Sequence, residues 1–273
     1  MAIKADFHLH SNHSGDSKAS MEEMILKGID LGLNAMCFTE HQDIDFNYED
    51  PSEEGMFDLN TDSYLYELLK MRSKYEGTIN ILFGVEIGSQ KHLRRELAVY
   101  SKAYDFDFII SSLHLLDGHD PYRKEFFEGK SDEEVYRHYF NEISENLKVF
   151  SNFDVLGHLD YIVRYGQSMD KDYSYDKYKD LIDPILEKIV DMGKGIELNT
   201  GAVKYGLKEM NPCNDIIKKY HDLGGEIITI GSDAHDPSRI ACEFKKAEEI
   251  LIDCGFKYYT TFEKRFAEYH KLG

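Results

Sequence analysis

The chain has 273 residues, of which 51 are acidic and 32 basic, giving a net charge of -19 at pH 7. Such a negative field repels polyanions and argues against a generic nucleic-acid-binding protein. No apolar run approaches the roughly 20 residues that cross a bilayer, and the amino-terminal residues contain no stretch of signal-peptide length. The four cysteines show no CxxC pairing, so we expect a cytoplasmic protein with reduced thiols and no membrane partner.

Short apolar runs rich in β-branched and aromatic residues alternate with longer amphipathic segments along the chain. The predicted strands are, in order, residues 3–7, 35–39, 79–87, 106–113, 154–156, 195–198 and 226–231. The predicted helices are residues 20–31, 62–75, 93–104, 132–152, 175–192, 211–223, 239–253 and 262–271. Ser20, followed three residues later by Glu23, is the capping-box pattern of a helix start.

Seven strand–helix units in series predict a parallel sheet with right-handed crossovers. No GxGxxG motif follows the first strand, so a dinucleotide-binding fold has no support. At this length a closed α/β barrel fits better than an open doubly wound sheet, and we expect residues 1–273 to form a single domain. Residues 42–61 and 115–131 are longer than ordinary βα loops, and long loops on that face commonly form a rim or a lid.

Nearly every predicted strand ends in a residue type that binds metal ions. These residues are His8, His10, Glu40, His41, Glu86, His114, His158, Asp160, Glu197, Asn199, Asp233 and His235. In a barrel of parallel strands such ends converge on the face where active sites are built. A single histidine at a strand end is more often a hydrogen-bonded structural residue than a ligand, but this set is hard to explain as structure.

Several imidazoles and carboxylates brought close together without a cation would be costly, because the carboxylates repel and the buried polar groups lack partners. A polynuclear metal site removes that cost. Imidazole and carboxylate ligands without thiolate favour Zn, Mn or Fe. The number of ligands exceeds what one ion can use, so we expect two or three divalent ions.

Six motifs in order carry a resemblance to a known family. They are His8-Leu9-His10-Ser11, Thr39-Glu40-His41, Gly84-Val85-Glu86, Ser112-Leu113-His114, Gly157-His158 and Ser232-Asp233-Ala234-His235. Together they resemble the motifs of the polymerase and histidinol phosphatase (PHP) superfamily, over residues 6 to 240. Gly157-His158-Leu159-Asp160 with Arg164-Tyr165, and Glu197-Leu198-Asn199-Thr200-Gly201, resemble its histidinol-phosphatase branch.

The resemblance implies a distorted seven-stranded (β/α)7 barrel, similar to a TIM barrel, with a trinuclear metal site. One ion would take His8, His10, Glu86 and Asp233. A second would share Glu86 as a bridge and add His114 and His158. A third would take His41, His235 and the residue six after His10, which is Asp16 here; family members vary at that position.

The resemblance also implies a phosphatase of histidine biosynthesis that hydrolyses L-histidinol phosphate, a small phosphorylated substrate, to L-histidinol and phosphate. A hydroxide bridging two ions would attack phosphorus in line. Charge on the phosphoryl oxygens calls for a cation: the candidates, in order, are Arg164, Lys204 and Arg239, each of which also reads as a plain surface cation. Asp160 or His235 would protonate the leaving oxygen, and Glu40 would act beside the ligands.

The organic part of the substrate carries an ammonium group and an imidazole ring. Tyr161 or Tyr165 could pack on the ring. An acidic rim would suit the cation, and its candidates are Asp43, Asp45, Glu49, Asp117 and Asp120.

Three alternatives stay open at this point. One is a PHP phosphoesterase of other specificity, acting on phosphotyrosine or on nucleic-acid 3′ ends. Another is a metal-dependent amidohydrolase, although the fourth strand supplies His114 where that family often has a lysine ligand. The third is a non-catalytic metal-binding module, which a turnover assay would separate from an enzyme.

Overall fold

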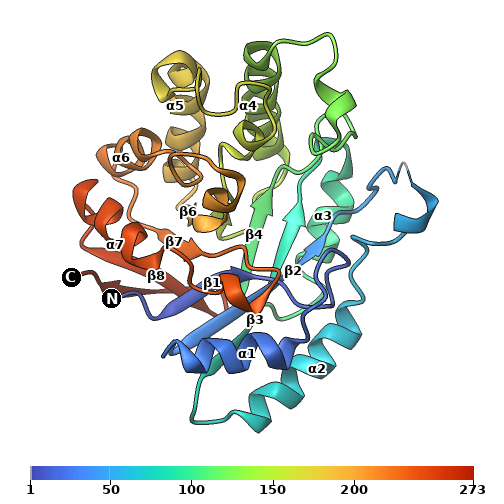
Figure 1. The fold of residues 1–273 in the computed structure, drawn as a ribbon, viewed down its shortest axis with the longest axis vertical. Helices are drawn as coiled ribbons and strands as arrows, with labels where there is room; N and C mark the ends of the chain where they lie inside the picture. Colours follow the sequence, from blue (N-terminus) through green and yellow to red (C-terminus); the bar gives the residue numbers. More distant parts are fainter. Residues whose placement is uncertain (1, 49) are drawn as a thin grey trace.

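The computed structural model describes residues 2–48 and 50–273 and contains a barrel-like sheet surrounded by helices (Figure 1). The sheet has seven parallel strands in sequence order. They are β1 (Ala5–Leu9), β2 (Ala35–Gln42), β3 (Asn80–Gly88), β4 (Phe108–Ser112), β5 (Val155–Leu156), β6 (Gly195–Asn199) and β7 (Ile228–Gly231). The predicted parallel α/β barrel is confirmed.

The first and last strands nearly close the sheet into a barrel. The backbone N–H of Asp233 donates to the carbonyl of His8 at 2.7 Å, and the N–H of His10 donates to the carbonyl of Ala234 at 2.9 Å. The buried carboxylate of Asp6 in β1 also accepts hydrogen bonds from the backbone N–H and hydroxyl of Ser232. The hydrogen-bonded contact between β1 and β7, the seam of the barrel, therefore lies at the carboxyl ends of the strands, where the histidines are.

The strands read as continuous apolar runs because helices cover the outside of the sheet and side chains fill the inside. Every residue of β1 and β7 is buried, and in β2 and β3 only the first residue is more exposed. The register between β2 and β3 pairs His41 with Glu86. Two polar side chains at the ends of buried strands are thus brought side by side by the ladder itself.

Seven α-helices follow the strands within the described residues. They are α1 (Met21–Asp30), α2 (Thr61–Lys74), α3 (Arg94–Tyr100), α4 (Asp132–Val149), α5 (Tyr175–Asp191), α6 (Asn214–Asp222) and α7 (Phe244–Asp253). The predicted capping box of Ser20 and Glu23 is present at the start of α1. None of the helices in residues 2–48 and 50–273 is long and apolar enough to cross a membrane.

The predicted helix at residues 262–271 is wrong. This segment forms an antiparallel hairpin of β8 (Tyr258–Glu263) and β9 (Phe266–Lys271). Lys264 and Arg265 turn the chain with positive φ angles of 50° and 67°, as the tightest hairpin turns require. The backbone N–H groups of both residues donate to Asp107, which immediately precedes β4, so the hairpin tip packs against the amino ends of the strands.

Candidate metal centre

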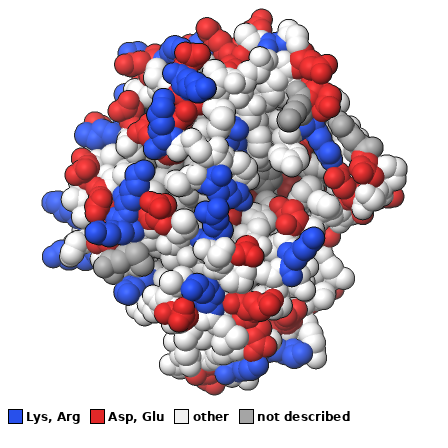
Figure 2. Space-filling model, viewed as in Figure 1, with Lys and Arg blue, Asp and Glu red and all other residues white. Residues whose placement is uncertain are grey.

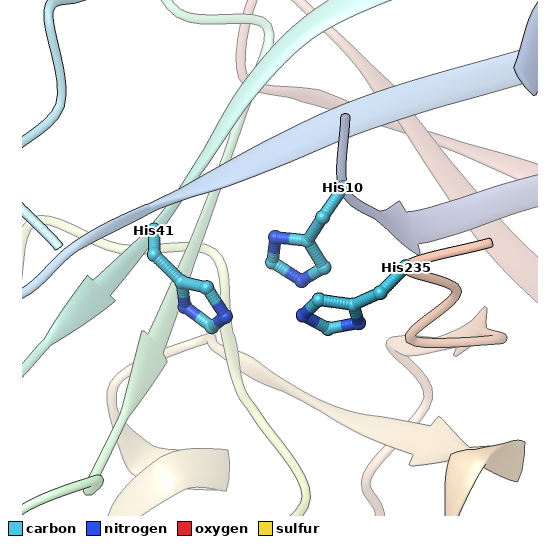
Figure 3. Close-up of side chains that lie close together, drawn as sticks. All are labelled: His10, His41 and His235. Atoms are coloured by element: carbon cyan, nitrogen blue, oxygen red, sulfur yellow. The ribbon is translucent and has the colours of Figure 1, made fainter. Parts of the chain in front are cut away.

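Three histidines from distant parts of the chain stack their rings at the carboxyl ends of the strands (Figure 3). The ring centroid of His10, just after β1, lies 4.2 Å from that of His41 in β2 and 4.2 Å from that of His235. One ring nitrogen from each of the three histidines lies within 4.8 Å of the other two, close enough for all three to bind one metal ion. The predicted convergence of the strand-end histidines is therefore seen in the geometry.

Glu86 in β3 is the hub of this cluster. Its two buried carboxylate oxygens lie 3.0 Å from His8 Nε2, 3.1 Å from His41 Nδ1, 3.1 Å from His114 Nε2 and 2.9 Å from His158 Nε2. Because each oxygen of this carboxylate faces two imidazoles, Glu86 is placed to be a ligand shared between ions.

Two aspartates complete the set of nine residues predicted as ligands. Asp233 Oδ1 lies 3.7 Å from His8 Nε2 and 3.5 Å from His10 Nε2. Asp16 Oδ2 lies 2.9 Å from His235 Nε2 and 3.5 Å from the Nε2 atom of His41. Asp233 has a φ angle of 52°, in the left-handed region that few non-glycine residues adopt.

The donor atoms fit a divalent cation better than they fit one another. Among the described residues, the buried atoms His10 Nε2, His41 Nδ1 and His235 Nε2 have no hydrogen-bond partner of good geometry, although carboxylates lie beside them. Buried polar atoms are normally paired. Imidazole nitrogens and carboxylate oxygens without any thiolate are the ligand mixture of Zn, Mn and Fe sites.

The electrostatics point the same way. Burial alone would raise the pKa of Glu86, but His8 and His114 hold it well below its usual range. Burial alone would lower the pKa of His8, but Glu197 and Glu86 raise it well above its usual range. Burial and two neighbouring imidazoles keep the pKa of His10 well below its usual range, so this ring is neutral. Ionised Glu86 and neutral His10 are already in the protonation states that bind metal, whereas His8 must first lose its proton.

A second layer of carboxylates orients the predicted ligands. Glu197 in β6 contacts His8 Nδ1 at 2.6 Å and accepts the backbone N–H of His158 at 3.0 Å. Asp43 contacts His114 Nδ1 at 2.8 Å. A proton held on Nδ1 leaves the Nε2 lone pair free for a metal ion. From sequence, Glu197 is predicted only to end a strand and Asp43 only to belong to an acidic rim, so neither residue is expected in this role.

A cavity of about 310 Å³ opens over the cluster. Both long loops contribute to its wall: Phe46, Glu53, Met56 and Phe57 from the first, and Asp120, Tyr122 and Arg123 from the second. An ion pair of Arg123 with Glu53 joins the two loops. The predicted role of these loops in forming a rim is thus met, whereas lid closure stays a prediction.

The charge of the cavity differs from the expected acidic rim. Asp43 and Asp120 line it, but Asp45 and Asp117 do not, and Glu49 lies outside the described residues. Arg123, Arg164 and Lys204 bring positive charge to the same wall. Figure 2 shows a face that is hollowed near its centre, with acidic and basic side chains intermixed around the hollow.

The predicted substrate-binding residues divide into two groups. Arg164, Lys204, Tyr161 and Tyr165 line the cavity. Arg164 is buried, and its guanidinium carbon lies 4.5 Å from the centroid of Tyr161 and 4.8 Å from that of Tyr205. A buried cation beside the cluster is well placed to meet an anionic group in the cavity.

Glu40 and Arg239 do not line the cavity, so neither is placed to bind substrate, and this corrects the expected role of Arg239 in binding the phosphoryl group. Glu40 is fully buried behind the cluster, where it accepts hydrogen bonds of 2.6 Å from the hydroxyls of Ser11 and Ser14. It therefore holds the loop that carries Asp16. Arg239 ends a short 3₁₀ helix (Pro237–Arg239) and is exposed.

Asp160, one of two predicted proton donors, is also absent from the cavity wall, whereas His235 lines it. The carboxylate of Asp160 is 1% exposed and accepts hydrogen bonds from Asn211 and from the backbone of Cys213. Burial raises the pKa of Asp160 to about 6. A proton on this group has no direct path to a leaving oxygen in the cavity.

A nearly closed βα barrel with His, Asp and Glu side chains gathered at the carboxyl ends of its strands defines a metal-dependent hydrolase of the barrel type. Residues 6–201 match the PHP domain, and the chain belongs to this family.

The similarity extends over nearly the whole chain. A probable histidinol-phosphatase of Clostridium acetobutylicum is 36% identical over 267 residues, covering 97% of this chain and 98% of the relative. The histidinol-phosphatase of Lactococcus lactis is 30% identical over 260 residues, covering 95% and 94%. The crystal structure of the Lactococcus lactis enzyme with zinc, L-histidinol and phosphate superposes with a TM-score of 0.87, covering 97% of this chain and 99% of that one.

Proposed function

We propose that this protein is a histidinol-phosphatase, which hydrolyses L-histidinol phosphate to L-histidinol and inorganic phosphate in histidine biosynthesis. The observation that carries the proposal is the buried His, Glu and Asp cluster that shares one cavity with Arg164. It is supported by the relatives of the same name, which match this chain over nearly their full lengths. We further propose that residues 1–273 act as one domain in the cytoplasm.

The nine clustered residues are proposed to hold two or three divalent ions. The Lactococcus lactis structure contains zinc, and the donor atoms here also suit Mn or Fe. The sets are those expected from the family resemblance, with Glu86 shared between two ions and Asp16, His41 and His235 around a third. Bound ions would lower the pKa of a water molecule from near 16 towards about 7 and neutralise charge on the phosphoryl oxygens.

Arg164 is proposed to bind the phosphoryl group. Its Nη1 atom lies 3.7 Å from Asp233 Oδ2, which places the guanidinium at the edge of the metal cluster. Among the described residues its buried Nε atom has no hydrogen-bond partner, so this donor is available to a ligand oxygen. Lys204, which is exposed on a 3₁₀ helix (Thr200–Tyr205), adds a second positive charge at the cavity wall.

The remaining wall suits the organic part of the substrate. Tyr122, Tyr161 and Tyr165 offer aromatic faces for an imidazole ring, and Asp120 and Asp43 offer carboxylates for an ammonium group. Of the two predicted proton donors, His235 is the one whose side chain reaches the cavity. A net charge of -19 makes a polyanionic substrate such as nucleic acid a poor alternative.

The test is phosphate release from L-histidinol phosphate by protein reconstituted with Mn or Zn, beside a chelator-treated sample. A phosphotyrosine peptide serves as the competing substrate. We expect metal-dependent turnover that is at least a hundredfold faster on L-histidinol phosphate. Turnover of another phosphoester with inert L-histidinol phosphate would overturn the substrate assignment and leave the phosphatase class standing.

A further inference from the structure

Behind the cavity wall, three buried polar side chains form a hydrogen-bonded row that ends at Arg164. The carboxylate of Asp160 accepts a hydrogen bond of 2.6 Å from Asn211 Nδ2 and one of 2.9 Å from the backbone N–H of Cys213. The carbonyl oxygen of Asn211 in turn accepts a hydrogen bond of 3.0 Å from Arg164 Nη2. The three side chains come from two segments well separated in sequence.

The hydrogen bonds fix which way the Asn211 amide points. An ionised carboxylate only accepts hydrogen bonds and a guanidinium only donates them. The amide must therefore turn its NH₂ group to Asp160 and its oxygen to Arg164. In the flipped orientation the NH₂ group would face the N–H of Arg164, and the amide oxygen would face the carboxylate of Asp160. The backbone of Asn211 is also held, since it exchanges hydrogen bonds of 3.1 and 2.7 Å with Asn199 at the end of β6.

Within the described part of the chain, Asn211 supplies the one hydrogen bond that the guanidinium of Arg164 makes. The rings of Tyr161 and Tyr205 lie beside the guanidinium at 4.5 and 4.8 Å, but such contacts hold a cation without setting the direction of its N–H groups. The hydrogen bond on Nη2 sets that direction, and it leaves Nε free for a ligand.

We propose that Asn211 and Asp160 are positioning residues, which act through Arg164 to aim its guanidinium at the phosphoryl group in the cavity. This inference rests on the proposed function, because it needs an anionic group for Arg164 to bind. It gives Asp160 a role different from that of proton donor. Asp160 holds the amide of Asn211, and Asn211 holds the arginine.

A double-mutant cycle tests the first step. Asn211→Ala is made in the wild-type protein and in the Arg164→Ala variant, and kcat/KM is measured for L-histidinol phosphate and for p-nitrophenyl phosphate. We expect Asn211→Ala to lower kcat/KM at least tenfold in the wild type, because a buried hydrogen bond to a charged group is lost. The same change should cost less than twofold where Arg164 is already absent.

Equal losses in the two backgrounds would overturn the proposal, because Asn211 would then act independently of Arg164. Asn146→Ala is the matched control: Asn146 is buried in α4, where its Nδ2 donates to the carbonyl of Glu142. It should leave kcat/KM unchanged. Metal content and melting temperature, measured on every variant, separate lost positioning from lost folding or lost metal.

Asp160→Asn tests the second step by comparing leaving groups. A missing proton donor slows the hydrolysis of alkyl phosphates such as glycerol 2-phosphate and L-histidinol phosphate, whereas p-nitrophenolate leaves without a proton. A positioning role predicts the same fold loss on both kinds of ester, about tenfold. A loss confined to the alkyl phosphates would restore Asp160 as the proton donor and overturn its assignment here.

Failure of the proposed function is distinguishable from failure of this inference. If L-histidinol phosphate is inert but p-nitrophenyl phosphate is hydrolysed, the double-mutant cycle measured with p-nitrophenyl phosphate still tests the positioning role of Asn211. If neither ester is hydrolysed, the affinity of the metal-loaded protein for inorganic phosphate is measured by calorimetry on the same four proteins. Weaker phosphate binding by Asn211→Ala only where Arg164 is present supports positioning, and equal weakening in both backgrounds refutes it.

Discussion

Replacing Glu197 with glutamine probes how the predicted ligands are oriented. Glu197 is 1% exposed, and its two oxygens serve His8 Nδ1 at 2.6 Å and, at 3.0 Å, the backbone N–H of His158. It also accepts a hydrogen bond of 3.2 Å from Asn199 Nδ2. A glutamine oxygen can replace only one of the carboxylate oxygens. Its NH₂ group then faces either the ring N–H of His8 or the backbone N–H of His158, so two donors oppose each other.

The magnitude follows from the lost hydrogen bond. A hydrogen bond to a charged group is worth about 1.5–3 kcal/mol, and removing such an outer partner of a metal ligand commonly costs 10–100-fold in affinity. We therefore expect Glu197→Gln to weaken metal binding about 10–100-fold.

The measurement is competition for Zn²⁺ between the protein and a chromophoric chelator. Glu249→Gln, a change of an exposed glutamate on α7, is the control and should bind as the wild type does. Wild-type zinc affinity in a folded Glu197→Gln protein would show that the carboxylate does not orient His8.

Three further predictions concern protons, packing and phosphate. Burial alone would lower the pKa of His114, but the carboxylates beside it raise it to about 10, so the metal-free protein carries a proton there at neutral pH. Metal uptake should release protons and strengthen as pH rises towards that value, as calorimetry in buffers of different ionisation enthalpy would measure; uptake without proton release would contradict this. In the metal-free protein the same raised pKa stabilises the fold fully below the usual pKa of about 6.5, and this stabilisation is lost as pH rises through about 10. Gly231→Ala would place a Cβ atom 2.2 Å from the Cβ atom of buried His8 and should lower the free energy of unfolding by about 1–3 kcal/mol in denaturant titrations, where an unchanged midpoint would refute the clash. Lys204→Ala should raise the inhibition constant of inorganic phosphate several-fold with unchanged metal content, whereas exposed Arg239→Ala should leave this constant unchanged. An equal rise of the inhibition constant in both variants would place both cations at the phosphate.

The sequence predicted the parts of the molecule that follow local rules. Buried parallel strands are continuous apolar runs, and a polar residue at the end of such a run, such as His114, must point into the site or the loops. The hairpin of β8 and β9 was missed because its mixed charges read as an amphipathic helix. Tertiary packing determines the hairpin: the ring centroids of Phe262 and Phe108 lie 5.1 Å apart, and the turn is hydrogen-bonded to Asp107.

The second layer of the site was beyond local rules. Glu197 lies 189 positions from His8, and Asn211 lies 47 positions from Arg164. No local sequence pattern indicates that these residues meet in the fold. Asp160 was expected to protonate the leaving oxygen, and Glu40 to act beside the ligands, because both neighbour ligand motifs in sequence. In the fold both are buried behind the wall of the cavity, where they hold other side chains.

The seam between β1 and β7 has a consequence for the synthesis of the protein. His8 and His10 leave the ribosome first among the clustered residues, and Asp233 and His235, which face them across the seam, leave more than 200 residues later. At about 5–20 residues per second, the nascent chain waits roughly 10–50 s for the second half of the cluster. The complete centre can therefore form only after residue 235 has emerged, and until then His8 and His10 lack Asp233 and His235.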